Sequence, residues 1–218
     1  MFKMNTRSVW TAIFSLMAIV AVARGDGATT RPTGDDVIAV ARNFPDGGGY
    51  KWAGSGVSEE TKHDGKTVLA KSAEGTYCCG FTFNVAMRTA QQFDLLKGKT
   101  FDEIKQFQRA WYGNSKDKDI IERQPVRAMI DLGVGHDVKL DDAQPGDFLQ
   151  FWRGKSGHSV VFLNWIEKDG KRVGFNYRSS QNATNGIGDH IEYLNDSGIE
   201  GGEVDPKRMY FARFGVKE

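Results

Sequence analysis

The spacing of apolar residues changes near Asp141, and this change limits the chain to folds that combine helices with a sheet. Before that point apolar side chains recur every three or four residues, as on one face of a helix, from Cys78 onward and again over Phe101–Trp111. After it they alternate, as in half-buried strands. The expected strands span 148–152, 158–165, 172–177 and 209–214. Helices first and an antiparallel sheet afterwards predict a single α+β domain.

Local signals add further elements. Thr33 is a suitable N-cap for a short helix with an acidic first turn, which the Pro- and Gly-rich segment 43–49 ends. Another helix is expected over about 126–132. Asp169-Gly170 lies between two strands and has the signature of a two-residue hairpin turn. The polar segment from about 57 to 75 is expected to be a surface loop.

The first residues differ in kind from the rest of the chain. Lys3 and Arg7 precede an apolar run over 9–22, which ends in the small-residue triplet Ala21-Val22-Ala23. This pattern predicts a secretory signal peptide, and the run is shorter than the ~20 residues that span a bilayer. We therefore expect an exported protein, periplasmic or extracellular, without membrane contact after cleavage. The expected divisions are a signal peptide at 1–23, a polar linker at 24–32 and one domain at 33–218.

Charge and residue spacing argue against several classes of partner. The chain carries 29 basic and 28 acidic residues and has a formal net charge of +1, without a basic stripe. Nucleic acid is therefore not an expected partner. The histidines and cysteines lack the spacing of metal ligands, so no metal or organic cofactor is expected. The oligomeric state does not follow from the sequence.

The only two cysteines, Cys78 and Cys79, are neighbours. They cannot join distant loops, and a disulfide between adjacent residues is strained and closes almost no loop. A reactive thiol is the better interpretation. The pair opens a predicted helix, where free backbone N–H groups and the helix dipole favour a thiolate.

A cysteine nucleophile needs a base, and four histidines are available. His63, His136 and His190 are expected to face solvent. His158 begins an apolar strand directly after the flexible segment 153–157, at the rim of the predicted sheet. We therefore expect His158 to be the base that pairs with the helix-opening cysteine.

A third polar group should orient the imidazole from the strand that follows His158. If Asp169-Gly170 is a two-residue turn, His158 lies across from Gln181, and Ser179 shares the same face of the sheet. A one-residue bulge would present the other face instead. Gln181 and Ser179 are both candidates, because an amide oxygen or a hydroxyl can accept the ring N–H.

Four short motifs follow one another in a characteristic order. They are Tyr50-Lys51-Trp52-Ala53-Gly54, Tyr77-Cys78-Cys79-Gly80-Phe81, Pro145-Gly146-Asp147-Phe148 and Gly157-His158-Ser159-Val160. Their order resembles that of the NlpC/P60-like superfamily, whose members are CHAP- or papain-like cysteine peptidases and amidases. The resemblance implies a papain-like fold, with the catalytic cysteine at a helix N-terminus packed on an antiparallel sheet. The chain departs from the family pattern at Tyr77, in place of aspartate, and at Ala53, in place of glycine.

The resemblance also implies roles at the matching positions. Cys78 aligns with the nucleophile, His158 with the base and Tyr50 with a tyrosine whose hydroxyl lies near the reacting carbonyl. Trp52 lines the substrate groove beside Tyr50. Cys79 occupies a serine position, and because adjacent helical side chains diverge by about 100°, it is expected to point into the helix packing as a small hydrophobe.

These roles describe amide or peptide hydrolysis through a thioester, with the oxyanion held by the backbone N–H of Cys78 and the hydroxyl of Tyr50. The implied substrate is a peptidoglycan peptide or another amide outside the cytoplasm. Two alternatives stay open. One is a catalytically silent module that binds a glycan or peptide in the same groove, and the other is an acyltransferase or transglutaminase-like enzyme.

Overall fold

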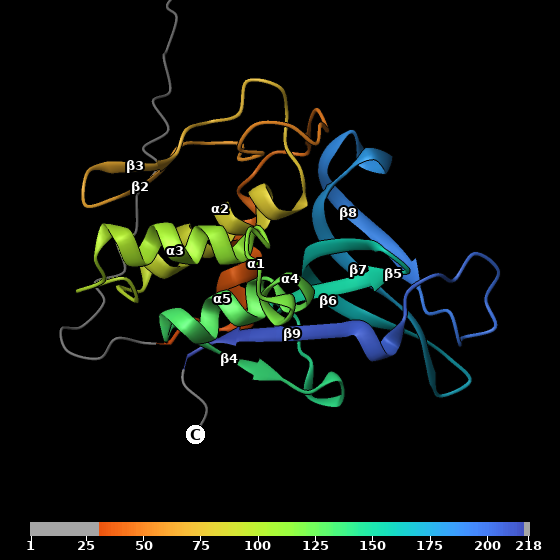
Figure 1. Ribbon diagram of the computed structural model, residues 1–218. Helices are drawn as coiled ribbons and strands as arrows, with labels where there is room; N and C mark the ends of the chain where they lie inside the picture. Colours follow the sequence, from red (N-terminus) through yellow and green to blue (C-terminus); the bar gives the residue numbers. More distant parts are fainter. Residues whose placement is uncertain (1–30, 216–218) are drawn as a thin grey trace, which may run out of the picture.

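The computed structural model describes residues 31–215. The expected signal peptide at 1–23 and most of the expected linker lie outside the described residues. Within them, helices and strands form an α+β arrangement in which the helices gather on one side of a sheet (Figure 1). This confirms the predicted fold class at that level. No helix among residues 31–215 is both long enough and apolar enough to cross a membrane.

The main sheet in the described part of the chain has seven strands, and every pairing in it is antiparallel. In spatial order the strands are β1 (Gly47–Gly48), β8 (Gly186–Tyr193), β7 (Lys171–Gln181), β6 (Ser156–Lys168), β5 (Phe148–Arg153), β9 (Met209–Phe214) and β4 (Gly135–Val138). The centre of the sheet therefore comes from the segments in which the sequence alternates between apolar and polar residues.

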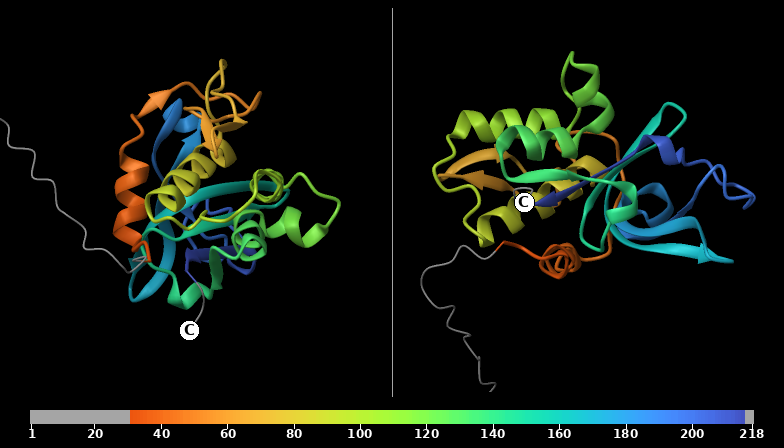
Figure 2. Two further views of the ribbon diagram at one scale, coloured as in Figure 1. Left: turned by 90° about the vertical axis from the view of Figure 1, so that its left-hand side faces the viewer. Right: turned by 90° about the horizontal axis from the view of Figure 1, so that it is seen from below.

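The described residues form five α-helices, which are α1 (Gly34–Arg42), α2 (Cys78–Gln92), α3 (Phe101–Trp111), α4 (Lys118–Arg123) and α5 (Pro125–Leu132). Of these, α1, α2, α3 and α5 begin at or within one residue of the predicted positions, and α4 was not predicted. Thr33 caps α1 in a capping box with Asp36, and Thr100 caps α3 in the same way with Glu103. Helix α2 packs on β6 and β7, and α5 packs on β4, β5 and β9 (Figure 2). The predicted helix that starts at Cys78 therefore lies against the predicted histidine strand.

Alternation along the strands gives the sheet two apolar faces. One face packs against the helices, where the ring of Trp111 meets that of Phe148. The other holds a second cluster that includes Phe151 and Tyr177. Burying both faces explains why the central strands contain so few charged residues.

A buried ion pair fixes the turn that leads into β5. Asp147 accepts hydrogen bonds from Arg213 of β9 at 2.7 and 2.9 Å and from the backbone N–H of Gln144 at 2.8 Å. Just before it, the chain passes so close to α1 that a Cβ on Gly34 would lie 1.9 Å from the carbonyl oxygen of Pro145. The motif Pro145-Gly146-Asp147-Phe148 therefore joins α1, β5 and β9. Its residues lie outside the lining of the main cleft.

The β6–β7 hairpin has the predicted turn at Asp169-Gly170, where both residues have positive φ, of 53° and 72°. The register shifts by one residue near Ile166 and shifts back near Asn164. Val161 therefore pairs with Arg178, the register that an unbulged hairpin would give. If the same register continues to the start of β6, His158 lies opposite Gln181.

Several elements were not predicted. They are α4, β1, β4, β8 and a separate hairpin of β2 (Thr61–His63) and β3 (Lys66–Leu69). The expected surface loop at 57–75 contains this hairpin, which turns at Asp64-Gly65 with φ of 47° and 74°. Strand β8 escaped detection because only two apolar side chains, Ile187 and Ile191, interrupt its polar and glycine residues.

Candidate active site

Cys78 is the first residue of α2, and its backbone leaves hydrogen-bond donors free. The first hydrogen bond of the helix runs from the N–H of Phe81 to the carbonyl of Tyr77, at 3.0 Å. The N–H groups of residues 78–80 therefore have no partner within the helix, and together with the helix dipole they favour a negative charge at this end. Cys78 is also buried, with 2% of its surface exposed.

Gly80 is required by close packing in this first turn. A Cβ at this position would lie 2.1 Å from the carbonyl oxygen of Gly56. The approaching group is the backbone of the loop that precedes α2. This contact fixes where the cysteine pair sits relative to that loop.

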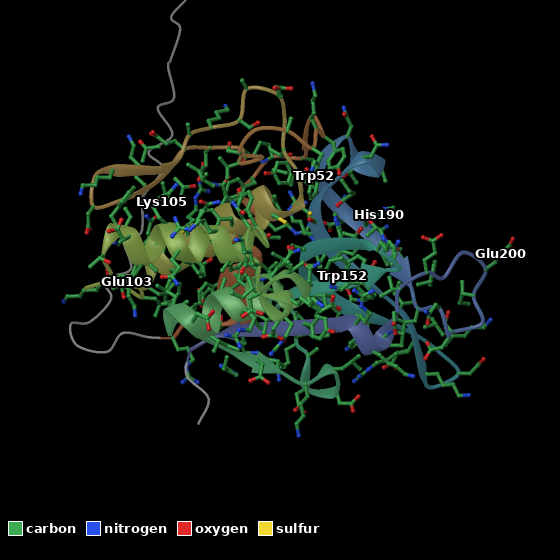
Figure 3. The ribbon with its side chains drawn as sticks, in the orientation of Figure 1. Trp52, Glu103, Lys105, Trp152, His190 and Glu200 are labelled. Atoms are coloured by element: carbon green, nitrogen blue, oxygen red, sulfur yellow. The ribbon has the colours of Figure 1, made fainter. Side chains whose placement is uncertain are left out.

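A cleft of about 580 Å³ opens where α2 and β6 begin and where β5 and β7 end, and β8 contributes to its wall. Its lining includes five of the predicted site residues together with Cys79: Tyr50, Trp52, Cys78, His158 and Gln181. Figure 3 labels three residues of this lining. Trp52 comes from a loop, Trp152 from β5 and His190 from β8. The sequence-predicted residues therefore converge on one cavity.

Two aromatic rings hold the imidazole of His158. The ring packs edge-on against Phe151 at 5.5 Å and against Tyr177 at 5.6 Å between centroids. The side chain is 6% exposed. An imidazole confined in this way keeps one orientation, which a base beside a nucleophile needs.

The pKa of the Cys78 thiol is lowered well below its usual value. The hydrogen bond that it accepts from the Cys79 thiol contributes most, and the charge and hydrogen bonding of His158 and the backbone N–H of Ser159 add to it. Burial acts in the opposite direction but is outweighed. The hydrogen bond to Cys78, burial and the negative charge of Cys78 raise the pKa of Cys79. The two shifts run in opposite directions, so Cys78 is the thiol of the pair that ionises more readily.

Cys79 does not point into apolar packing, and that expectation was wrong. Its Sγ lies 3.8 Å from the Sγ of Cys78, 3.5 Å from Oε1 of Gln124 and 3.7 Å from Oγ of Ser159. The Ser159 hydroxyl in turn donates to Oε1 of Gln150 at 2.5 Å. Polar groups therefore surround the sulfur of Cys79, and the residue lines the cleft.

Gln181 and Ser179, the two candidates for the residue that orients the imidazole, differ in their position relative to the cleft. Nε2 of His158 and Oε1 of Gln181 are both buried without a hydrogen-bond partner among the described residues, and both residues line the cleft. Ser179 instead donates to the backbone carbonyl of Ser159 at 2.7 Å and lies outside the cleft lining. The structure brings Gln181, rather than Ser179, to the cleft beside His158.

Tyr50 and Trp52 also line the cleft, and they come from the loop that follows β1. Tyr50 forms an isolated bridge with Thr76, two residues before Cys78. Burial and the negative charge of Cys78 raise the pKa of the Tyr50 hydroxyl, which therefore remains a donor. Trp52 is 67% exposed, and its ring packs on Tyr77 at 4.8 Å.

The other histidines differ from the expectation that all three face solvent. His63 is 7% exposed and its Nε2 bonds to the carbonyl of Lys99 at 2.6 Å. His136 is half-buried and bonds through Nδ1 to the carbonyl of Gly215 at 2.7 Å. His190 lies in the cleft wall, with its ring against Tyr177. Only His158 adjoins the cysteine pair.

Sequence reasoning missed Gln124 and a charged pair in the cleft. Gln124 joins α4 to α5 with a φ of 30°, a strained value for a residue other than glycine. Arg153 and Glu192, on β5 and β8, form an ion pair of 2.7 Å in the cleft wall. Strand β8 was not predicted, so no sequence signal could pair these two residues.

Among the described residues, no group of three or more histidine, cysteine, aspartate or glutamate side chains is arranged to hold a metal ion. The cleft offers one thiol pair and two separated imidazoles. A thiol beside an imidazole is an arrangement that can act as a nucleophile and a base.

Comparisons with known proteins leave the family open. No protein-family model matches the chain, and no solved structure matches it. An ATP synthase gamma chain from Synechococcus sp. (strain CC9605) is 30% identical over 100 residues, which are 45% of this chain and 31% of that protein. The chain therefore matches less than a third of that relative's length.

Proposed function

We propose that this chain is a cysteine hydrolase of amide or peptide bonds, with a papain-like fold of the NlpC/P60 kind. The observation that carries the proposal is the lowered pKa of Cys78 at the start of α2, beside His158 in a cleft. A thiolate next to an imidazole in a substrate-sized cleft is the arrangement that nucleophilic acyl transfer requires. The four sequence motifs also occupy suitable elements, since one precedes α2, one opens it, one precedes β5 and one starts β6.

In the proposed reaction the Cys78 thiolate attacks the carbonyl carbon of the amide. The developing oxyanion accepts hydrogen bonds from the backbone N–H of Cys78 and from the hydroxyl of Tyr50. The imidazolium of His158 then gives its proton to the leaving nitrogen, and the C–N bond breaks to leave a thioester. Water, deprotonated by His158, hydrolyses the thioester and restores the thiolate.

Gln181 is proposed to orient the imidazole. Nε2 of His158 and Oε1 of Gln181 are both buried and unpaired among the described residues, so they are not hydrogen-bonded to each other in this structure. In the proposed reaction the Gln181 side chain rotates to accept the Nε2–H, and Nδ1 faces the sulfur of Cys78. This bond would fix the tautomer, as the third member of a catalytic triad does.

The substrate is proposed to be a peptide of peptidoglycan or another amide outside the cytoplasm. Two arguments support this: the resemblance in motif order, and the signal-peptide pattern at 1–23. Trp52 offers an exposed ring at the cleft edge on which a peptide or sugar can pack.

The test is incubation of the purified chain with peptidoglycan, followed by mass spectrometry of the released fragments, with Cys78→Ser as the matched control. The proposal expects fragments that differ from the substrate by addition of water at an amide bond, and none from the control. Binding of peptidoglycan without release by either protein would indicate a silent binding module instead. Products joined to an added amine would indicate an acyltransferase.

A further inference from the structure

The cleft contains two thiols rather than one, and their sulfurs are adjacent. Cys78 and Cys79 are both free, and their Sγ atoms lie 3.8 Å apart. They are the only cysteines of the chain, so neither has another intramolecular partner. A hydrolase needs one nucleophilic sulfur, and the second is left without a role in that reaction.

The two sulfurs differ in the way that a thiol–disulfide exchange needs. Cys78 is held as a thiolate by its neighbours, whereas Cys79 keeps its proton among Gln124, Ser159 and Cys78. Only a thiolate attacks a disulfide, so Cys78 reacts first with an incoming oxidant. Cys79 then lies in contact with the newly modified sulfur.

We propose that Cys78 and Cys79 are a redox modification site, at which a small-molecule disulfide converts the pair into a reversible vicinal disulfide. Cys78 attacks one sulfur of the oxidant, whose S–S bond breaks, and the departing thiolate takes the proton of the His158 imidazolium. The now neutral imidazole of His158 takes the proton of Cys79, whose thiolate attacks the sulfur of Cys78, and the second departing thiolate receives that proton. Two cysteine thiols are oxidised, and one disulfide is reduced to two thiols.

The geometry makes this disulfide short-lived in a reducing solution. Adjacent Cα atoms are about 3.8 Å apart across a trans peptide, whereas disulfides usually join Cα atoms about 4.4–6.8 Å apart. The bond is therefore strained, and strained disulfides are the more easily reduced and regulatory ones. Such a bond is a poor structural staple but a suitable switch.

The position in the helix allows the ring to close. The N–H groups of Cys78 and Cys79 lie before the first hydrogen bond of α2, which starts at Phe81. Moving the two sulfurs from 3.8 Å to about 2 Å therefore breaks no N–H bond of the helix ladder. The carbonyls of Cys78 and Cys79 accept hydrogen bonds from the Thr82 hydroxyl at 2.9 and 3.4 Å, so closing the ring adjusts these two contacts.

The effect of this disulfide on activity rests on the proposed function. Forming the disulfide removes the Cys78 thiolate, so hydrolysis stops until a reductant restores it. It also shields Cys78 from irreversible oxidation to sulfinic acid. An exported enzyme meets an oxidising environment, where such protection has value.

The experiment exposes the purified chain to glutathione disulfide at pH 7, then quenches with acid, denatures, and labels remaining thiols with N-ethylmaleimide before measuring intact mass. We expect a monomer lighter by two hydrogen atoms that takes up no maleimide, and uptake of two after treatment with dithiothreitol. Cys79→Ser should stop at one bound glutathione on Cys78. Cys78→Ser should react at least about tenfold more slowly, because Cys79 is protonated.

Three outcomes would each overturn the proposal. They are accumulation of wild-type chain with one bound glutathione, uptake of two maleimide groups before dithiothreitol is added, and formation of a disulfide-linked dimer. These outcomes can be separated from failure of the proposed function. Rapid alkylation of Cys78 and release of peptidoglycan fragments without a vicinal disulfide would defeat the redox site alone. A vicinal disulfide in a chain that hydrolyses no amide would support the redox site and defeat the hydrolase.

Discussion

Gly80 lies so close to Gly56 that a Cβ on Gly80 would meet the carbonyl oxygen and Cα of Gly56 at 2.1 and 2.8 Å. Gly56 itself has a φ of 65°, and the ring of Tyr77 covers the place where its side chain would be. The first turn of α2 is thus seated on a loop backbone. The position of the Cys78 sulfur in the cleft depends on this seating.

Gly80→Ala should therefore destabilise the chain by about 1–3 kcal/mol, as overpacking of a buried position does, and reduce the rate through displacement of the first turn. Urea unfolding measures the first effect. Gln92→Ala, at an exposed position near the end of the same helix, is the matched control and should be nearly neutral. Equal stability of Gly80→Ala and the control would show that the close contact does not constrain α2.

Cys78→Ser should lower the rate of amide hydrolysis on the order of a thousandfold or more, as loss of an activated nucleophile does. Cys79→Ser should keep most of the activity, because its hydroxyl can still donate to the sulfur of Cys78. Steady-state kinetics on one substrate compare the two variants directly. The reverse order of damage would assign the nucleophile to Cys79.

Cys79→Ala tests the pH dependence. The hydrogen bond from Cys79 is the largest contribution that lowers the pKa of Cys78, so its loss should raise that pKa. The reactive form is the thiolate, which is present above the pKa, so the acid limb of the pH–rate profile should move to higher pH. Wild type and Cys79→Ser should have their acid limbs at the same, lower pH. An acid limb at the same pH in Cys79→Ala would show that the bond does not stabilise the thiolate.

His158→Ala should abolish turnover, and because the buried imidazole packs between Phe151 and Tyr177, its loss should also lower the free energy of unfolding, which is measured alongside the rate. His136→Ala is the control, because His136 lies outside the cleft and bonds only to a backbone carbonyl. His190→Ala is expected to be milder than His158→Ala, although His190 lines the cleft. If His190→Ala lost as much activity as His158→Ala, the base would be assigned wrongly.

Gln181→Ala should lower kcat more than it changes KM, because Gln181 acts on the imidazole rather than on bound substrate. Gln181→Asn shortens the side chain and should restore little, whereas Gln181→Glu keeps an acceptor oxygen in reach and should recover part of the rate. Ser179→Ala removes a bond to the Ser159 backbone and should affect mainly stability. A larger loss of kcat in Ser179→Ala would make Ser179 the orienting residue.

The helices and central strands could be predicted because their apolar spacing and capping residues are local in sequence. Phe101–Trp111 forms α3 with the predicted bounds, and Cys78 opens α2 as expected. The β2–β3 hairpin was missed although Asp64-Gly65 has the same signature as Asp169-Gly170. Its strands are three and four residues long and mostly polar, so alternation gave no signal.

The site could be predicted only as far as its sequence motifs and strand register reach. Gln181 followed from the register of one hairpin, and two opposite shifts in that hairpin happen to preserve it. The direction of Cys79 could not be inferred from helix geometry alone. It depends on Ser159 and Gln124, which come from a strand and a helix junction distant in sequence.

The central claim is that Cys78 is a thiolate activated by His158, and its alkylation rate tests this most directly. The purified chain is treated with a limiting amount of iodoacetamide at neutral pH, and the modified residue is mapped by mass spectrometry. We predict that Cys78 reacts before Cys79 and faster than the thiol of an unstructured reference peptide, and that His158→Ala slows the reaction. Labelling first at Cys79, or a Cys78 rate no greater than that of the reference thiol, would contradict the account.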